Sequence, residues 1–293
     1  MNSYSKSILC AVIVAILAPQ AHGLNIEAFF TASNADFTDE RTEETRILDP
    51  MDFQLGFRAK AALPVSDAFF VEIEAARDSV LRNILFIDFV HRDERITTSV
   101  GPYFGVLNVL ESPRQYFRPG LSAMVQVRFV HRVSLSFRSL YPFSRRLTSV
   151  GDYVQESAEI AAAVYLSNAV LSAEYRDTAY TSLESTGTRI SERQEYAFVA
   201  DLHQKNTPYR IRLTFAYHDR TLTFASSPPD TRAVHSTGSL VLGTRFELDF
   251  AHFTYVLDLN NSVYTFGKKD LIGVFNNEAY FFSGSTGLRL RLH

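Results

Sequence analysis

The segment Tyr209–His218, with the sequence YRIRLTFAYH, decides the fold because apolar and polar side chains alternate along it. One set of alternate positions is apolar or aromatic throughout, whereas the other includes Arg210, Arg212, Thr214 and His218. A β-strand places alternate residues on opposite faces, whereas a helix would scatter both sets around its axis. The segment is therefore predicted to be a strand with one apolar face and one charged face.

The same alternation recurs through the rest of the chain, for example in Leu24–Ser33, Asp52–Ala62 and Leu121–Phe129. No segment shows the 3.6-residue period of an amphipathic helix over three turns, so the chain is predicted to be all-β. The expected strands lie near residues 24–33, 52–62, 68–77, 82–91, 96–108, 120–131, 132–140, 153–166, 169–180, 194–204, 209–220, 238–250, 251–260 and 280–293.

The first 23 residues are predicted to be a cleaved signal peptide rather than part of the fold. Lys6 precedes the apolar run Ile8–Ala18, which is followed by the small-residue pattern Ala21-His22-Gly23. A positive start, a short apolar run and small residues at the end are typical of a secretory signal. The run is too short to span a bilayer as a helix, which needs about 20 residues. The alternative is a short buried N-terminal helix.

Composition excludes several classes of protein. The chain is 46% hydrophobic and 21% charged with a formal net charge of −3, so neither a disordered chain nor a strongly basic nucleic-acid-binding protein is indicated. The single cysteine, Cys10, lies in the predicted signal peptide, so the mature chain, Leu24–His293, has none. Disulfides and thiolate metal sites are thereby excluded from the mature chain.

The connections between expected strands alternate between short and long. Short ones lie near Leu63–Asp67 and Ser167–Asn168. Long polar ones are expected at Asn34–Met51, Val109–Pro119, Tyr141–Asp152, Thr181–Arg193, Thr221–Thr237 and Asn261–Ala279. Pro102 lies inside an expected strand and suggests a bulge there. No linker divides the mature chain, so residues 24–293 are expected to form one domain.

Taken together, the signal peptide, the alternating strands of about ten residues and the alternation of short turns with long loops resemble a bacterial outer-membrane β-barrel, porin-like in kind. The resemblance covers Leu24–His293 and implies a closed antiparallel up-and-down transmembrane barrel of about fourteen strands, with twelve as the alternative. It implies contact with membrane lipid, an outer-membrane location in a diderm bacterium and periplasmic N- and C-termini. A secreted soluble β-sandwich or lipocalin-like barrel is the alternative fold, but eight strands would leave over a hundred residues unexplained.

If the apolar face meets lipid, the opposite face lines the lumen and carries charges of both signs. The candidate lumen-lining residues are Arg58, Lys60, Glu72, Glu74, Arg128, Arg138, Glu159, Glu174, Arg176, Arg210, Arg212, Arg245, Glu247, Asp249, Arg289 and Arg291. Such residues form either the wall of a hydrated channel or a salt-bridged interior that holds the barrel round. The arginines of the second half could bind carboxylate or phosphate, unless the interspersed acids neutralise them.

No catalytic, cofactor or metal site is predicted. His235-Ser236 lies in an expected loop, and Thr254 beside His252 lacks a supporting motif for a nucleophile. The acidic segment 36–44 lacks the spaced ligands and glycine of an EF-hand, and no phosphate-binding loop or dinucleotide fingerprint occurs. We therefore expect a non-enzymatic protein without a cofactor.

Three functions remain open from the sequence. The first is a diffusive channel for small hydrophilic solutes or ions, which the strand number and polar inner faces favour. The second is a non-transporting structural or adhesive barrel that acts through its loops at the cell surface. The third is a transporter of hydrophobic molecules, which is disfavoured because alternation begins at Leu24, leaving no N-terminal plug before the first strand.

Overall fold

The computed structural model describes residues 24–33, 52–76, 83–108, 115–129, 132–150, 152–184, 187–204, 207–226, 232–267 and 282–292. The predicted signal peptide and the acidic segment 36–44 lie outside these residues. No helix within the described ranges is long and apolar enough to cross a membrane.

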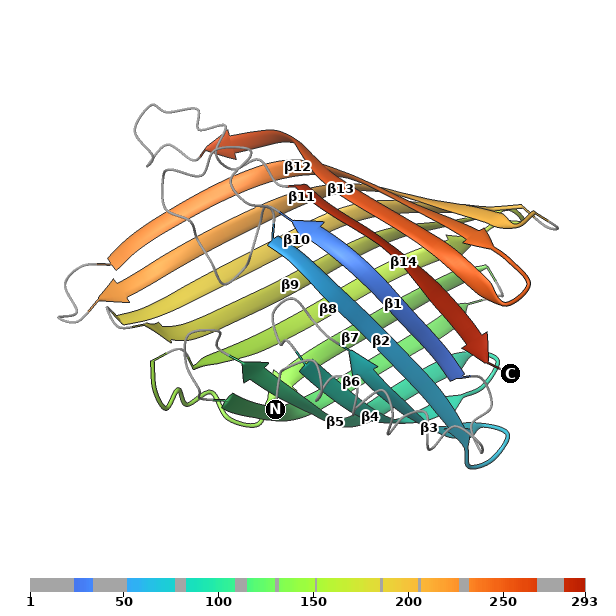
Figure 1. Cartoon of the computed structure of the whole chain (residues 1–293), viewed down its shortest axis with the longest axis horizontal. Coiled ribbons are helices and arrows are strands. Elements are labelled where there is room, and N and C mark those ends of the chain that lie inside the picture. Colours follow the sequence, from blue (N-terminus) through green and yellow to red (C-terminus); the bar gives the residue numbers. More distant parts are fainter. Residues whose placement is uncertain are drawn as a thin grey trace.

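The described residues form fourteen antiparallel β-strands, which confirms the prediction of an all-β, up-and-down architecture (Figure 1). The strands are β1 (Leu24–Ser33), β2 (Asp52–Pro64), β3 (Phe69–Ala76), β4 (Asn83–Arg92), β5 (Ile96–Asn108), β6 (Gln115–Phe129), β7 (Val133–Pro142), β8 (Tyr153–Tyr165), β9 (Ala169–Glu184), β10 (Gly187–His203), β11 (Tyr209–Ser226), β12 (Arg232–Asp249), β13 (Phe253–Gly267) and β14 (Phe282–Leu292).

Each strand pairs with its neighbours in sequence, and β1 also pairs with β14, so that the sheet closes into a barrel. Leu24 pairs with Leu292, which places the start of β1 and the end of β14 at the same end of the barrel. Figure 1 shows the blue β1 lying between β2 and the red β14. When the pairing register is followed once around the barrel, it returns to β1 at a residue about sixteen positions from the starting residue. For a barrel of this number of strands, that offset corresponds to a tilt of about 40° between the strands and the barrel axis.

Six strands extend well beyond their predicted ranges. β6 begins at Gln115, inside the expected loop Val109–Pro119. β9 to β13 continue into segments expected to be the long loops Thr181–Arg193, Thr221–Thr237 and Asn261–Ala279. The extensions of β9 to β13 are rich in Thr, Ser and charged residues, so the apolar outward face that identifies the strands does not continue into them. Backbone pairing alone is enough to hold such residues in a sheet, because each N–H and C=O finds a partner across the ladder.

The bulge expected at Pro102 is not found. The register between β4 and β5 is the same on both sides of Pro102, and only the pairs of Ile87 and Asp88 are missing from the ladder. Proline has no backbone N–H to donate, so it interrupts the hydrogen bonds without inserting a residue. The β12–β13 pair does shift register, between Leu240 and Val241.

Candidate functional site

The two faces of the barrel wall differ in chemistry, and β11 shows the difference along one strand. Its outward side chains are Tyr209, Ile211, Leu213, Phe215 and Tyr217, and Phe215 retains 51% of its surface exposed. The cross-strand register places the same kind of residue beside them, since Phe215 pairs with Phe198 and Leu242. The outer face is therefore a continuous exposed apolar surface over β10 to β12.

Aromatic side chains lie at one border of this apolar surface. Tyr175, Tyr196 and Tyr217 occupy paired positions on β9, β10 and β11, with ring centroids 5.0 Å and 6.4 Å apart. Beyond the row, the next outward residue on β9 is Asp177 and on β11 is Asp219. The outer face thus changes from apolar to acidic within one alternate position of the tyrosine row.

The opposite face carries the charged side chains and faces the inside of the barrel. Glu174 on β9 contacts Arg212 on β11 at 3.4 Å, past the intervening strand β10. This face of β9 to β13 encloses a cavity of about 280 Å³. The charged or titratable residues that line the cavity are Glu174, Arg176, Arg193, Glu195, Arg212, His218, Arg245 and Asp258.

Ion pairs on the inner face of the first strands join each strand to its neighbours. The guanidinium of Arg58 on β2 lies 3.0 Å from Glu74 on β3, and the Lys60 ammonium lies 2.6 Å from Glu72. Glu72 also receives Arg92 of β4 at 3.3 Å. The acids of β3 are therefore shared between the cations of both flanking strands.

A second network on β8 to β11 is centred on Glu195. The Glu195 carboxylate lies 2.9 Å from Arg193, 3.8 Å from Arg176 and 3.3 Å from the imidazole of His218. Arg176 in turn pairs with Glu159 at 2.9 Å. Four strands are linked in this way by side chains that point into the barrel.

Further ion pairs lie on β10 to β14, near the end of the barrel that carries both termini. Arg210 binds both carboxylate oxygens of Asp201 on β10. Glu247 accepts hydrogen bonds from Arg245 on its own strand at 2.8 Å and from Arg289 of β14 at 3.4 Å. Arg210, Arg245 and Arg289 thus each contact a neighbouring acid, as one of the two sequence interpretations allowed.

All sixteen residues named from the sequence as candidates for the lumen occupy register positions on this inner face, although Arg291 is described only by its backbone pairing with Asn25. Arg128 lies over the ring of Tyr165 at 5.6 Å rather than beside an acid. Arg138 lies opposite Glu159 in the register. Asp249 accepts a hydrogen bond from Thr254, so this threonine supports the β12–β13 turn.

The candidate list drawn from the sequence omitted several residues of the inner face, namely Asp88, Arg193, Glu195 and Asp201, and it omitted His218 although the alternation places His218 on the charged face. Arg193 fell in a segment expected to be loop, and Glu195 lay at the edge of the expected strand. No alternation marks this stretch, because Glu192 and Gln194 are polar as well as Ser191, Arg193 and Glu195. Asp88 lies in a strand that is apolar on both sides, where alternation gives no face.

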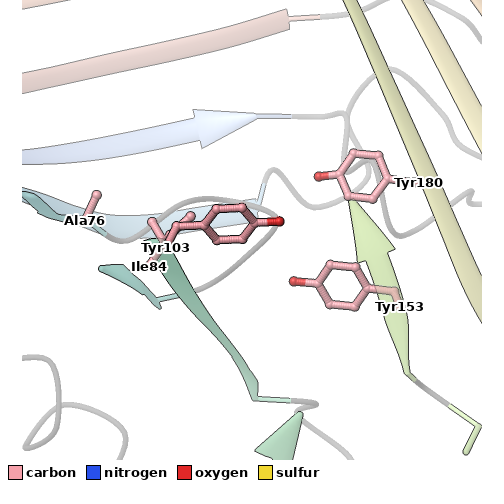
Figure 2. Packing of buried hydrophobic residues seen from close by; sticks show 5 residues of the cluster. All are labelled: Ala76, Ile84, Tyr103, Tyr153 and Tyr180. Carbon is pink, nitrogen blue, oxygen red and sulfur yellow. The ribbon is translucent and has the colours of Figure 1, made fainter. Parts of the chain in front are cut away.

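An aromatic cluster narrows the inside of the barrel at the end opposite the termini. Tyr103 of β5, Tyr153 of β8 and Tyr180 of β9 are buried together with Ala76 and Ile84 (Figure 2). In Figure 2 the Tyr153 and Tyr180 rings face Tyr103, whose strand lies three places from β8 and four places from β9. The described interior therefore has this apolar cluster near one end of the barrel, whereas ion pairs lie elsewhere on the inner faces of β2 to β4 and β8 to β14.

Among the described residues, no group of three or more His, Cys, Asp or Glu side chains is arranged to hold a metal ion. The inner face instead offers arginine forks, carboxylates and amides that can bind polar solutes by hydrogen bonds and charge.

No protein-family model and no curated protein matches the chain. Among solved structures, the chain is similar to a loop-deleted form of OmpT, an outer membrane protein of Vibrio cholerae, at 8% identity and a TM-score of 0.46, covering 93% of this chain and 100% of that chain. It is also similar to the CymD monoaromatic hydrocarbon channel, at 10% identity and a TM-score of 0.47, covering 97% and 92%. An anion-selective porin from Comamonas acidovorans gives 10% identity and a TM-score of 0.41, covering 93% and 99%. The solved structures that resemble this chain are outer-membrane β-barrel proteins.

Proposed function

We propose that the mature chain is an integral outer-membrane β-barrel of fourteen strands and forms a diffusive channel for small hydrophilic solutes. The observation that carries this proposal is the sorting of side chains by face, with exposed apolar residues outside and paired charges inside. A soluble barrel has the reverse arrangement, because its apolar residues fill the interior. An apolar outer face is stable where lipid, rather than water, surrounds it.

The dimensions of the apolar surface support a membrane location. On β11 it runs from Tyr209 to Tyr217, a length of about 27 Å along the strand at about 3.4 Å per residue. With a strand tilt of about 40°, this corresponds to a height of about 21 Å, close to the apolar band of about 25 Å in outer-membrane barrels. The tyrosines at both ends are suited to the two membrane interfaces, since a tyrosine ring is apolar and its hydroxyl is polar.

The same reasoning gives the orientation of the barrel in the membrane. Both termini of an even-stranded barrel lie on one side, and in outer-membrane barrels that side is the periplasm with the short turns. The turns at residues 65–68, 93–95 and 166–168 would then be periplasmic, and the segment 143–150 would face the outside. The polar extensions of β9 to β12 beyond the tyrosine row would project from the outer surface.

A channel is favoured over a filled barrel because fourteen strands enclose more space than inward side chains fill in the eight-stranded type. The cavity beside β9 to β13 and the charged residues around it support a water-filled path. One observation favours the second candidate, a non-transporting barrel that acts through its surface: the cluster of Tyr103, Tyr153 and Tyr180 narrows the interior.

Planar-bilayer conductance of the refolded mature protein, residues 24–293, separates the two candidates. Stable ohmic steps are expected for the channel, and replacing Arg128, Arg210 and Arg212 with Glu should shift ion selectivity toward cations, because charges in a lumen tune permeation. A correctly folded barrel, judged by heat-modifiable gel mobility, that conducts no current would refute the channel and leave the surface-acting barrel.

A further inference from the structure

We propose that Arg212 and Arg245, on the inner faces of β11 and β12, bind the oxyanion group of a small solute, a carboxylate or a phosphate ester. The inference rests on the proposed channel, in which the solute reaches this wall through the lumen. It assigns a chemical class to a solute that the channel function alone leaves open.

The first observation is that two like charges lie directly opposite each other. Arg212 and Arg245 are paired positions in the β11–β12 ladder and point to the same face. Directly opposed like charges destabilise an antiparallel pair, because their side chains are close together. Negative charge placed between or beside the two guanidinium groups would remove this repulsion.

The neighbouring carboxylates satisfy the two arginines unequally. Arg245 donates from Nε to Glu247 at 2.8 Å and lies 3.8 Å from Asp258. Among the described residues, Arg212 reaches only Glu174, with a single Nη2 contact of 3.4 Å, and Glu174 already accepts a 2.8 Å hydrogen bond from Ser172. The Arg212 side chain also remains 43% exposed. Of the two arginines, Arg212 therefore has more N–H groups left to donate to a ligand in the cavity.

The balance of charge around the cavity points the same way. The lining residues include four arginines, Arg176, Arg193, Arg212 and Arg245, but only the three carboxylates of Glu174, Glu195 and Asp258. Beyond the lining, Arg176 also pairs with Glu159 at 2.9 Å and Arg245 with Glu247 at 2.8 Å. Arg212, whose contact with Glu174 is 3.4 Å, is therefore the lining arginine least closely paired with an acid, and an anionic group in the cavity would give it a closer partner.

The shape of the wall leaves room for the ligand beside Arg212. Gly243, between Thr214 and Asn260 in the register, has no side chain of its own, and the Asn260 side chain lies over it. The cavity of about 280 Å³ accommodates a small molecule, and a planar guanidinium binds two oxygens of a carboxylate or phosphate at once.

Calorimetric titration of the refolded mature barrel in detergent tests the site without relying on conduction. The probes are sodium succinate and glycerol 3-phosphate at low ionic strength, which distinguish a carboxylate from a phosphate ligand. We expect saturable binding of at least one probe, and Arg212→Gln should weaken it about tenfold or more, because the ligand loses a charged hydrogen-bonding partner. Arg58→Gln, which removes an equal charge from the same face on β2, should change the affinity less than about twofold.

Arg212→Lys keeps the charge but loses the planar fork, so its affinity should lie between those of the wild type and Arg212→Gln. If Arg212→Gln does not show the gel mobility of a folded barrel, Arg212→Lys serves as the test variant in its place. Absence of saturable binding to the wild type, or equal losses in Arg58→Gln and Arg212→Gln, would overturn the site. Binding without conductance would retain the site and refute the channel, whereas conductance without binding would do the reverse.

Discussion

Arg118 on β6 binds Asp152, the residue immediately before β8, and the Asp152 side chain has no exposed surface. The Arg118 Nε donates to Oδ1 of Asp152 at 2.9 Å. The other carboxylate oxygen accepts hydrogen bonds from the backbone N–H and the hydroxyl of Thr148, at 2.7 Å and 2.8 Å. One buried carboxylate thus ties the segment 143–150 to the barrel beside the aromatic cluster.

Replacing Asp152 should destabilise the barrel more than replacing an exposed acid. Asp152→Ala leaves the guanidinium of Arg118, which is only 13% exposed, without its partner. Breaking a buried pair in this way costs about 3 kcal/mol of unfolding free energy. Urea unfolding in lipid vesicles measures the loss, with the exposed Asp67→Ala as the control, for which a change within about 0.5 kcal/mol is expected. Equal unfolding midpoints for the two variants would contradict a structural role for Asp152.

The ring of Tyr103 lies against Gly120, its register partner on β6. A Cβ added at Gly120 would overlap this ring, and Tyr103 keeps only 2% of its surface exposed. Gly120→Ala should therefore destabilise the fold by about 1–3 kcal/mol through overpacking. Thermal melting of Gly120→Ala, Tyr103→Leu and the double variant tests the contact, because the smaller Leu side chain should make the second substitution cost less. Strictly additive losses would show that the two residues do not interact.

The turn between β4 and β5 carries an acid whose ionised form is favoured. Oδ1 of Asp93 accepts hydrogen bonds from the backbone N–H groups of Ile96 and Arg95, at 2.7 Å and 2.6 Å. These bonds lower the pKa of Asp93 below its usual value of 3.8. Because the folded pKa is depressed, the stabilisation is present above about pH 4 and is lost as the pH falls through the folded pKa.

An NMR titration of the Asp93 carboxyl in the refolded barrel checks this direction. The midpoint should lie below 3.8 in the wild type and rise in a urea-unfolded sample, because unfolding removes both backbone donors. A folded-state midpoint at or above the unfolded one would contradict the role of the turn.

The sequence predicted the strands best where one face is apolar. The bounds of β5, Ile96–Asn108, agree with the predicted strand, and those of β8 differ from the prediction by one residue at most. In these segments the outward side chains are mostly apolar and the inward ones mostly are not, so the fold leaves a period of two in the sequence. The polar upper parts of β10 to β12 leave no such period, because water faces both sides of the sheet there.

The candidate site was predictable only in part for the same reason. Alternation places Arg210, Arg212 and Arg245 on one face, but it does not reveal which arginine an acid neutralises. That depends on the register between strands, which pairs Arg212 with Arg245 and brings Asp201 within reach of Arg210. Register is fixed by turn lengths and by packing around the closed barrel rather than by any one strand.

The proposed orientation predicts which positions can be labelled from outside the cell. The mature chain lacks cysteine, so single substitutions give unambiguous sites. Ser144→Cys, in the exposed segment before β8, should react with a membrane-impermeant maleimide in intact cells. Asn168→Cys, in the exposed turn between β8 and β9, should react only after the outer membrane is permeabilised. The opposite labelling pattern would invert the barrel in the membrane.

Two adjacent alanines on β8 test which face meets lipid. Ala162 points outward with its partners Leu135 and Ala173, whereas Ala161 points inward with Ser136 and Glu174. An arginine at Ala162 would face the hydrocarbon, at a cost of about 2–4 kcal/mol near the midplane. An arginine at Ala161 would face water and the Glu174 carboxylate, so its cost should be small.

The two variants have the same composition and differ by one position on one strand. Refolding yield and unfolding free energy in lipid vesicles should therefore fall for Ala162→Arg and stay near wild type for Ala161→Arg. Equal losses, or a larger loss for Ala161→Arg, would show that the exposed apolar face does not contact lipid.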